Sequence, residues 1–490
     1  MGRIDFPAGL CENAGERIAK EGTRMKKQAF NPYLPSWEYI PDGEPYVFGD
    51  RVYVYGSHDF FNGCVFCMGD YMGWSAPVND LSDWRCEGVI FPRDGDPANA
   101  AGKMCLYAPD VTKGPDGRYY LYYVYDKVGF VSVAVCDSPA GRYKFLGYVH
   151  DRNGVRLGDR PGDEPQFDPG VLTEGDKTYL YTGFCARGDK SRHGAMCTVL
   201  GPDMLTIEEE PVFVAPGCEY AEGTGFEGHA FFEASSIRKR NDTYYFVYSS
   251  TVMHELCYAT ASDPRGPFTY GGVIVSNNDL HIAAYKPADK PVALGGNNHG
   301  SIVEINGQWY IFYHRQTNGS WFSRQGCAEP IFFDEKGHIQ QVEITSCGLN
   351  GGPLKGEGEY PAYIACHLFT GKPVLYSGEP GLPRITQDGR DDDKTPGFVA
   401  DIQDGTTIGF KYFDCKGVKG VSIETRCYCN GAFEVKTAWD GPVLAKIPVV
   451  SSNVWEKNTA RFDFPDGKQA LYLTYRGTGK PSLKCVAFEK

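Results

Sequence analysis

The sequence predicts an all-β protein, a five-bladed β-propeller followed by a C-terminal β-sandwich. Three observations lead to this prediction: a strand-turn-strand pattern recurs five times, one tyrosine in each repeat keeps the same place, and helical stretches are scarce. The chain has 490 residues, of which 42% are hydrophobic and 14% aromatic, a composition typical of a folded protein with more than one domain.

Each repeat consists of a short strand, a tight turn and an aromatic strand. The turns contain Gly-Asp, Asp-Gly, Asn-Asp or Asn-Gly, which are typical of hairpins. The repeats occupy residues 44–57, 110–124, 168–182, 233–249 and 299–314. Their aligned tyrosines are Tyr53, Tyr120, Tyr179, Tyr245 and Tyr310. Spacings of 67, 59, 66 and 65 residues fit one four-stranded blade per repeat, and five blades closed into a ring leave only short strand edges.

The end of the repeats divides the chain into segments. We expect an N-terminal extension over residues 1–30 and the propeller over residues 31–350. A Gly-rich connector, residues 348–362, then leads into alternating strands. Residues 361–490 are long enough to form a domain of their own, for which a β-sandwich is the simplest prediction.

Composition and charge exclude several classes of function. The net charge of −13 and the lack of a basic run argue against nucleic-acid binding. No apolar run suggests a membrane span, and residues 1–30 carry charges throughout and lack the apolar stretch of a signal peptide, so we expect a cytoplasmic protein. The odd number of cysteines, 17, fits reduced thiols better than a disulfide framework.

An ionisable residue begins the first strand of every repeat. Counting back from the aligned tyrosines gives Asp42, Asp110, Asp168, Glu233 and His299. The innermost strands of a propeller run side by side along its central channel, so we expect these five side chains around one mouth of the channel. The alternative is that each acid caps backbone groups near a turn.

Crowded carboxylates are suited to acid-base chemistry. Neighbouring carboxyl groups shift one another's pKa values apart, so that one stays protonated and another ionised near neutral pH. Glycoside hydrolysis requires two such groups, one to protonate the leaving oxygen and one to activate water.

Five segments resemble the blade motifs of glycoside hydrolase family 43. They are residues 31–59, 106–111, 167–172, 231–239 and 298–316, and they follow one another in the order of the family. The resemblance implies a five-bladed propeller that hydrolyses arabinofuranosides, xylosides and related linkages with inversion, requires no cofactor and takes a small oligosaccharide as substrate.

The resemblance also implies catalytic roles. Asp42 matches the family's general base, Glu233 its general acid, and Asp168 the third carboxylate, which raises the pKa of the acid and orients it. Asp110 matches no member of this triad and is expected as a substrate-pocket or structural residue. The sequence departs from the family where Gly43 follows the base and Ala234 follows the acid, which weakens any transfer of substrate preference.

Four further residues are candidates for the site. His299 resembles a family histidine that often helps to hold a calcium ion, mostly through waters; the alternative is a hydrogen-bonded structural histidine, because calcium prefers oxygen ligands. Arg315 matches an arginine near the substrate, or else forms a surface salt bridge. Tyr107 is expected as an aromatic wall against which a sugar packs. His58 is a weaker candidate for the pocket.

Residues 385–414 and 472–489 resemble the β-sandwich of family 6 carbohydrate-binding modules. Trp439 and Trp455 would be its sugar-stacking platforms; alternatively, the domain only buttresses the propeller, which we favour.

The leading functional hypothesis is an inverting exo-glycosidase that removes α-L-arabinofuranosyl or β-D-xylosyl units from oligosaccharides. The alternatives are a non-catalytic carbohydrate-binding propeller and a related exo-glycosidase with galactoside specificity. A retaining fructosidase would need an Asn-Asp-Pro motif, which the sequence lacks.

Overall fold

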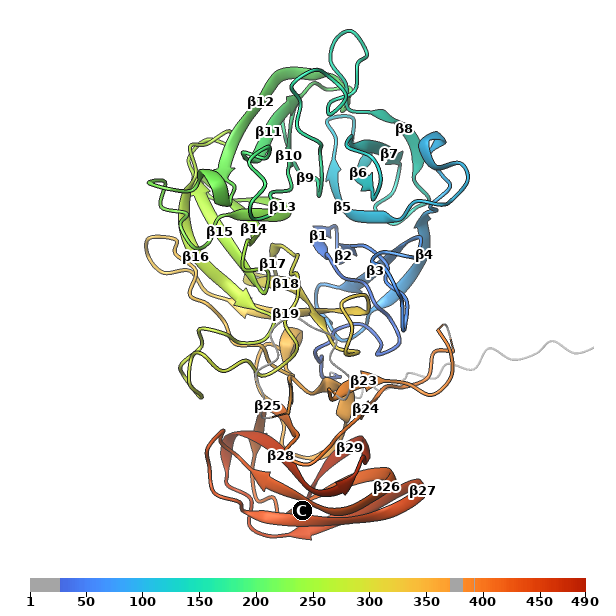
Figure 1. Cartoon of the computed structure of the whole chain (residues 1–490), viewed down its shortest axis with the longest axis vertical. Coiled ribbons are helices and arrows are strands. Elements are labelled where there is room, and N and C mark those ends of the chain that lie inside the picture. Colours follow the sequence, from blue (N-terminus) through green and yellow to red (C-terminus); the bar gives the residue numbers. More distant parts are fainter. Residues whose placement is uncertain (1–26, 371–381, 392) are drawn as a thin grey trace, which may run out of the picture.

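The computed structural model describes residues 27–370, 382–391 and 393–490. Five small sheets surround a central axis, and a larger C-terminal sheet lies beside the ring (Figure 1). This arrangement confirms the predicted fold class of a five-bladed propeller followed by a second β-domain. Of the predicted N-terminal extension, residues 1–26 lie outside the described residues.

The five blades are antiparallel sheets whose strands follow chain order, with the first strand of each nearest the axis (Figure 1). Blade one contains β1 (Glu44–Phe48), β2 (Arg51–Tyr55), β3 (Tyr71–Pro77) and β4 (Arg85–Phe91); blade two contains β5 (Leu106–Lys113), β6 (Tyr119–Tyr125), β7 (Ser132–Cys136) and β8 (Lys144–Tyr148). Blade three contains β9 (Gly170–Glu174), β10 (Lys177–Thr182), β11 (Gly194–Leu200) and β12 (Ile207–Pro216); blade four contains β13 (Phe231–Arg240), β14 (Thr243–Ser250), β15 (Glu255–Ala261) and β16 (Thr269–Ser276). Blade five contains β17 (Ile302–Ile305), β18 (Gln308–Gln316) and β19 (Arg324–Ile331).

The aligned tyrosines all lie on the second strand of a blade, as predicted. The fifth blade differs from the prediction of four strands, because its sheet has three. After β19 the chain forms only an isolated antiparallel bridge between Phe333 and Ile339, and Val342 then pairs in parallel with Val275 of the preceding blade. The chain thus leaves the ring towards the second domain instead of adding an outer strand.

The ring closes where the first and last blades meet. Gly43, just before β1, forms a parallel bridge with Gly300, just before β17. A Cβ atom on Gly300 would lie 1.8 Å from the carbonyl oxygen of Phe312, so the close approach requires glycine. The closure brings Asp42 and His299, which precede the two glycines, to the same end of the channel.

Aromatic and aliphatic side chains between neighbouring blades form the core of the propeller. Blades one and two share one cluster, which includes Tyr55 and Leu121, and blades three and four share another, which includes Tyr181 and Phe246. These strands are buried on both faces, which explains why the repeats read as nearly continuous aromatic and β-branched runs.

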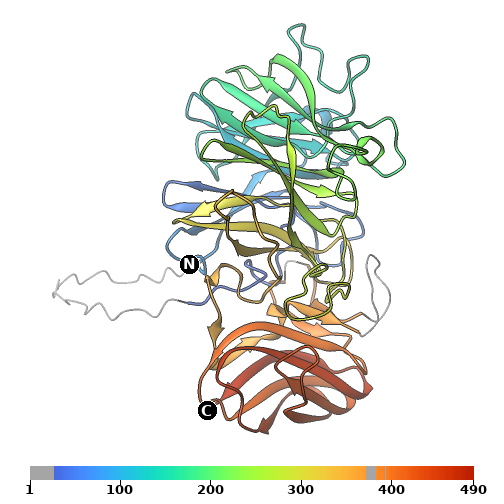
Figure 2. The same ribbon diagram turned by 90° about the vertical axis from the view of Figure 1, so that its left-hand side faces the viewer.

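The C-terminal domain is a ten-stranded sheet that curls around its own core (Figure 2). The curled sheet is consistent with the predicted β-sandwich. Its strands are β20 (Leu354–Lys355), β21 (Gly358–Pro361), β22 (His367–Phe369), β23 (Arg384–Thr386), β24 (Phe398–Ala400), β25 (Thr407–Cys415), β26 (Gly420–Lys436), β27 (Ala445–Arg461), β28 (Gly467–Gly479) and β29 (Ser482–Glu489).

A buried ionic cluster joins the two domains. Lys411 of β25 is fully buried, and its Nζ lies 3.0 Å from Asp279 Oδ2 and 3.2 Å from Glu343 Oε2. Asp279 belongs to the long loop between β16 and β17, so the C-terminal domain is attached to a segment that also reaches the mouth of the channel.

Helices contribute little to the described residues. They are the single 3₁₀ turns η1 (Pro97–Asn99), η2 (Cys218–Tyr220), η3 (Gly348–Asn350) and η4 (Ala362–Ile364). None of the helices in the described ranges is long and apolar enough to span a bilayer.

Candidate active site

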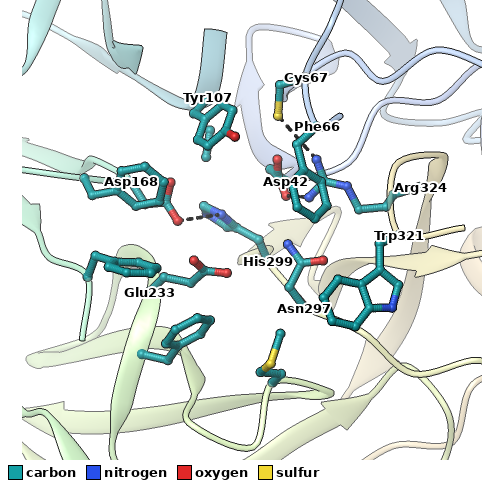
Figure 3. Close-up of a pocket in the computed structure, with 15 residues that line it drawn as sticks. Asp42, Phe66, Cys67, Tyr107, Asp168, Glu233, Asn297, His299, Trp321 and Arg324 are labelled. Carbon is teal, nitrogen blue, oxygen red and sulfur yellow. Dashed lines mark hydrogen bonds and ion pairs between the residues drawn. The ribbon is translucent and has the colours of Figure 1, made fainter. Parts of the chain in front are cut away.

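A cavity of about 290 Å³ opens at the end of the channel where the first strands of the blades begin (Figure 3). Asp42, Asp168, Glu233 and His299 all line it. Four of the five ionisable residues predicted at this mouth therefore share one cavity, and the blades' inner strands place them there.

Asp42 is a buried carboxylate held in its ionised form. Its Oδ1 lies 2.8 Å from Nη1 of Arg324 and 3.2 Å from Nδ1 of His314. Burial alone would raise the pKa of Asp42, but the charge of Arg324 and the neighbouring His314 hold this pKa below its usual range. Both contacts fall on Oδ1, and within the described part of the chain no hydrogen bond occupies Oδ2.

Arg324 owes its position to Asp59. Nε and Nη2 of the arginine lie 2.8 Å and 3.0 Å from the two carboxylate oxygens of Asp59, a bidentate pair that fixes the guanidinium plane. The backbone N–H of Cys67 also donates to Asp59, which is fully buried. Sequence reasoning missed both Asp59 and Arg324, although Asp59 directly follows the candidate His58.

Glu233 reaches the cavity from a bulge in β13. The pairing with β14 shifts register on both sides of Glu233, and Ala234 adopts a left-handed backbone with φ 67°. A bulge of this kind turns a side chain away from the regular strand direction. The backbone N–H of Ala234 donates a 3.0 Å hydrogen bond to Asp168 Oδ2, which ties the acidic segment of blade four to blade three.

The pKa of Glu233 is suited to an acid. Burial, and then the negative charge of Asp168, raise the pKa of Glu233 to about 8. Burial likewise raises the pKa of Asp168, against the opposing charge of His299. No hydrogen bond to the Glu233 carboxyl group is found among the described residues, and the group lines the cavity.

Aromatic side chains form the walls of the cavity. Tyr107, predicted as an aromatic wall, is among them and packs edge-to-face on Phe167. The aromatic lining consists of Phe66, Tyr107, Phe167, Phe184, Phe232 and Trp321. Rings of this kind provide apolar faces for the C–H surfaces of a sugar.

Asp110 does not line the cavity, so the structure assigns it the structural role rather than the pocket role. The residue expected at the cavity lies four positions before the residue that pairs with the aligned tyrosine. In blade two Tyr120 pairs with Thr112, so the residue at the cavity is Ala108. Asp110 lies two residues further along β5, one layer deeper in the channel. The predicted count failed because the turn of this blade has five residues instead of the two found in the others.

The deeper layer closes the floor of the cavity. Asp110 accepts hydrogen bonds from the Tyr46 hydroxyl and from the backbone N–H groups of Val111 and Val171. Glu44, beside it, pairs with Arg238 at 2.7 Å. Glu44, Asp110 and Arg238 are all buried, so the layer closes the base of the cavity, although Glu44 Oε1 and Arg238 Nε have no hydrogen-bond partner among the described residues.

Two further predictions about the pocket are wrong. Arg315 is buried on the opposite face of β18, where it donates to the backbone carbonyls of Ala365 and Cys366 at the domain junction. His58 lies outside the cavity lining, with Nε2 3.1 Å from Glu38 Oε1 and Nδ1 3.1 Å from the carbonyl of Asp70.

The surroundings of His299 do not fit a calcium ion held by its ring. Nδ1 lies 3.7 Å from Asp168 Oδ2, and Nε2 lies 3.8 Å from Glu44 Oε1. Burial lowers the pKa of His299, but Glu44, Asp168 and Asp42 outweigh it and raise this pKa to about 9. The described residues contain no group of three metal-ligating side chains that includes His299.

The arrangement is suited to hydrolysis by acid and base. A protonated Glu233 and an ionised Asp42 face one cavity from different blades (Figure 3). Asp168, which lies beside Glu233, acts on the acid through charge and through the backbone of Ala234. This division of roles between two carboxyl groups is the one that glycoside hydrolysis requires.

Comparison with known proteins agrees with this chemistry. The sequence model named "Glycosyl hydrolases family 43" matches residues 49–339. A xylosidase/arabinosidase from Thermoclostridium stercorarium is 66% identical over 466 residues, which cover 94% of this chain and 98% of that protein.

Solved structures are similar in the propeller and across both domains. A family 43 β-xylosidase/α-arabinofuranosidase from a compost microbial metagenome, solved with xylotriose in a calcium-free form, is 27% identical, with a TM-score of 0.50 over 64% of this chain and 98% of that one. An arabinoxylan arabinofuranohydrolase from Bacillus subtilis, 21% identical with a TM-score of 0.50, covers 94% of this chain and 97% of its own and shows the same two-domain fold.

Proposed function

The chain belongs to glycosyl hydrolase family 43, and we propose that it is an exo-acting xylosidase/arabinofuranosidase that hydrolyses β-D-xylosyl or α-L-arabinofuranosyl linkages in plant-derived oligosaccharides with inversion. The relative at 66% identity carries the name xylosidase/arabinosidase and matches nearly the whole chain. The observation that carries the mechanism is the pairing of an ionised Asp42 with a protonated Glu233 in one cavity.

In the proposed reaction Glu233 donates its proton to the leaving oxygen while Asp42 takes a proton from a water molecule. The water attacks the anomeric carbon from the face opposite the leaving group, which inverts the configuration. Asp42 Oδ2 is the oxygen that receives the proton, because Arg324 and His314 contact Oδ1. Asp168 raises the pKa of the acid and holds its backbone.

The closed floor supports exo action. Because the buried layer around Glu44 and Asp110 fills the channel below the cavity, an oligosaccharide enters from the open side and places a terminal unit against the carboxyl groups. Glu233 and Asp42 make the proton transfers of this reaction, and no group of three metal-ligating side chains in the described ranges includes His299.

The test is release of 4-nitrophenol from the β-D-xyloside, α-L-arabinofuranoside and β-D-galactoside by wild type, Glu233→Gln and Asp42→Asn. We expect activity on at least one pentoside, lowered in either variant by roughly 10²–10⁴-fold, and product of inverted configuration by NMR. Activity on the galactoside alone would favour the galactosidase alternative. No turnover of these substrates or of xylo- and arabino-oligosaccharides, with sugar binding intact, would favour the non-catalytic propeller.

We propose a buttressing role for the C-terminal domain. Trp439 packs against Phe369, with ring centroids 5.5 Å apart, and the guanidinium of Arg426 lies 4.2 Å from the ring centroid of Trp455. These contacts use ring surface that a sugar platform would need. Replacing both tryptophans with alanine should leave binding to insoluble arabinoxylan unchanged, whereas a clear loss would support a carbohydrate-binding module.

A cytoplasmic location is also a proposal. It is supported by the 16 cysteines within the described ranges, all of which are free thiols, as expected in a reducing compartment. Recovery of the enzyme in the secreted fraction of the source cells would contradict it.

A further inference from the structure

A second group of ionisable side chains gathers beside the active-site cavity. One ring nitrogen of His254, one of His281 and one carboxylate oxygen of Glu255 lie within 4.8 Å of one another. His254 and Glu255 stand at the start of β15, and His281 lies in the loop between β16 and β17. The group therefore links two chain segments that pack at the edge of blade four.

The two carboxylate oxygens of Glu255 differ in their hydrogen bonding. Its side chain is fully buried, and Oε1 is contacted by His229 Nδ1 at 2.7 Å, Ser250 Oγ at 2.6 Å and Cys257 Sγ at 3.3 Å. Oε2 is also buried, yet no hydrogen-bond donor reaches it from the described residues. A buried carboxylate oxygen without a partner is costly, and a cation would satisfy it.

The tautomer of His254 is the one that a metal ligand needs. Ser276 Oγ donates to Asn278 Oδ1 at 2.8 Å, so it accepts from the His254 Nδ1–H group, which lies 3.0 Å away. The lone pair of the ring then belongs to Nε2. Metal-ligating histidines are typically oriented by such a second hydrogen bond.

His281 is the member of the group whose side chain is free to move. Its side chain is exposed, and its ring centroid lies 5.8 Å from that of His254. Ligand atoms around a tetrahedral zinc ion lie about 3.3 Å apart, given zinc–ligand distances of roughly 2.0–2.1 Å. An exposed side chain can move inward by the required ångström or so through its own torsions, without any change in the buried ligands.

The neighbouring group of His229, Glu255 and Cys257 is a hydrogen-bonded ion pair instead. His229 Nδ1 already bonds the carboxylate oxygen directly at 2.7 Å, and burial and the nearby carboxylate raise the pKa of the Cys257 thiol. A metal there would have to break the ion pair and deprotonate a buried thiol.

We propose that His254, Glu255 and His281 bind a divalent cation of the zinc class, with water completing a tetrahedral shell. Two imidazoles and one carboxylate suit zinc and related transition metals, whereas calcium takes oxygen ligands. The cation satisfies Glu255 and joins the β14–β15 turn to the loop after β16. Met253, next to His254, lines the active-site cavity, so the ion stiffens one of its walls.

The experiment is a zinc titration of the full-length, chelator-treated protein in competition with a chromogenic zinc indicator. Exposed thiols such as Cys64 and Cys86 are first alkylated, because thiols also bind zinc. Wild type should bind one zinc ion per chain that His281→Gln binds at least ten-fold more weakly. His338→Gln, which removes another exposed imidazole, is the matched control and should bind like wild type.

Cobalt provides a second readout that does not depend on glycosidase activity. Wild type loaded with Co²⁺ should show the visible absorption of a tetrahedral nitrogen- and oxygen-ligated ion, and His281→Gln should lose it. The thermal unfolding of both proteins in chelator should coincide, because His281 is exposed. Equal zinc affinity in wild type and His281→Gln, or equal loss in His338→Gln, would overturn the proposal.

Discussion

Asp168 Oδ2 accepts a 3.0 Å hydrogen bond from the backbone N–H of Ala234, the residue next to Glu233. This bond joins blades three and four at the level of the cavity and places the third carboxylate beside the acid. Since two neighbouring carboxyl groups resist ionising together, the same contact that positions Glu233 also keeps it protonated.

Replacing Asp168 with asparagine should change the pH dependence of the enzyme. Glu233 works in its protonated form, so kcat/KM falls as the pH rises through the Glu233 pKa of about 8. Asparagine retains an acceptor for Ala234 but removes the negative charge, so the alkaline limb should move to lower pH by about one unit or more. An unchanged alkaline limb in the pH profile would show that Asp168 does not tune the acid.

The Arg324→Lys substitution should weaken the base. Lysine keeps the charge but cannot bridge Asp42 and Asp59 with a planar fork, so kcat/KM should fall roughly 10–100-fold. The pKa of Asp42 should rise towards its ordinary value, which moves the acidic limb of the pH profile to higher pH. Arg315→Lys is the matched control: it removes an equally buried fork outside the cavity lining, and its pH profile should coincide with that of wild type.

Asp110→Asn should lower the stability of the protein without lowering its catalytic rate. The new amide cannot accept hydrogen bonds from Tyr46, Val111 and Val171 together, so we expect a loss of unfolding free energy of about 1–3 kcal/mol. Because Asp110 does not line the cavity, kcat of the folded variant should stay close to wild type. Denaturant unfolding and initial rates test both statements, and a fall in kcat as large as that of Asp42→Asn would contradict the placement.

Lys411→Met should loosen the domain junction. Removal of this buried cation leaves Asp279 and Glu343 without their shared partner, which should cost roughly 3–5 kcal/mol of unfolding free energy. Lys416→Met changes an exposed lysine in the same domain and should have little effect. Chemical denaturation of both variants gives the comparison. Equal stability of the two would mean that the cluster does not hold the domains together.

Much of the fold could be predicted because its information is local. Each hairpin carries its own turn residues and its own tyrosine, so the register of Tyr53, Tyr179 and Tyr310 could be counted from the sequence. That register led directly to Asp42 and Asp168, which the structure places in the cavity. The count of eleven residues held in blades one, three and five, whose first hairpins have two-residue turns, whereas blade four needs one residue more because of the bulge at Glu233.

The remaining part of the site depends on information that is not local. The five-residue turn between Lys113 and Tyr119 moves Asp110 one layer down and leaves Ala108 at the cavity. The sequence also could not show which of two arginines lies at the active site. Arg315 and Arg324 lie on adjacent strands but on opposite faces of the sheet, and only the fold shows which face meets Asp59, 265 residues earlier in the chain.

The closing of the ring at Gly43 and Gly300 has a consequence for biosynthesis. Asp42 and the guanidinium that keeps it ionised are 282 residues apart in the chain. A chain released after four blades therefore holds the acid and its neighbouring aspartate but has no properly charged base. The base is therefore complete only when the last blade meets the first at Gly43 and Gly300.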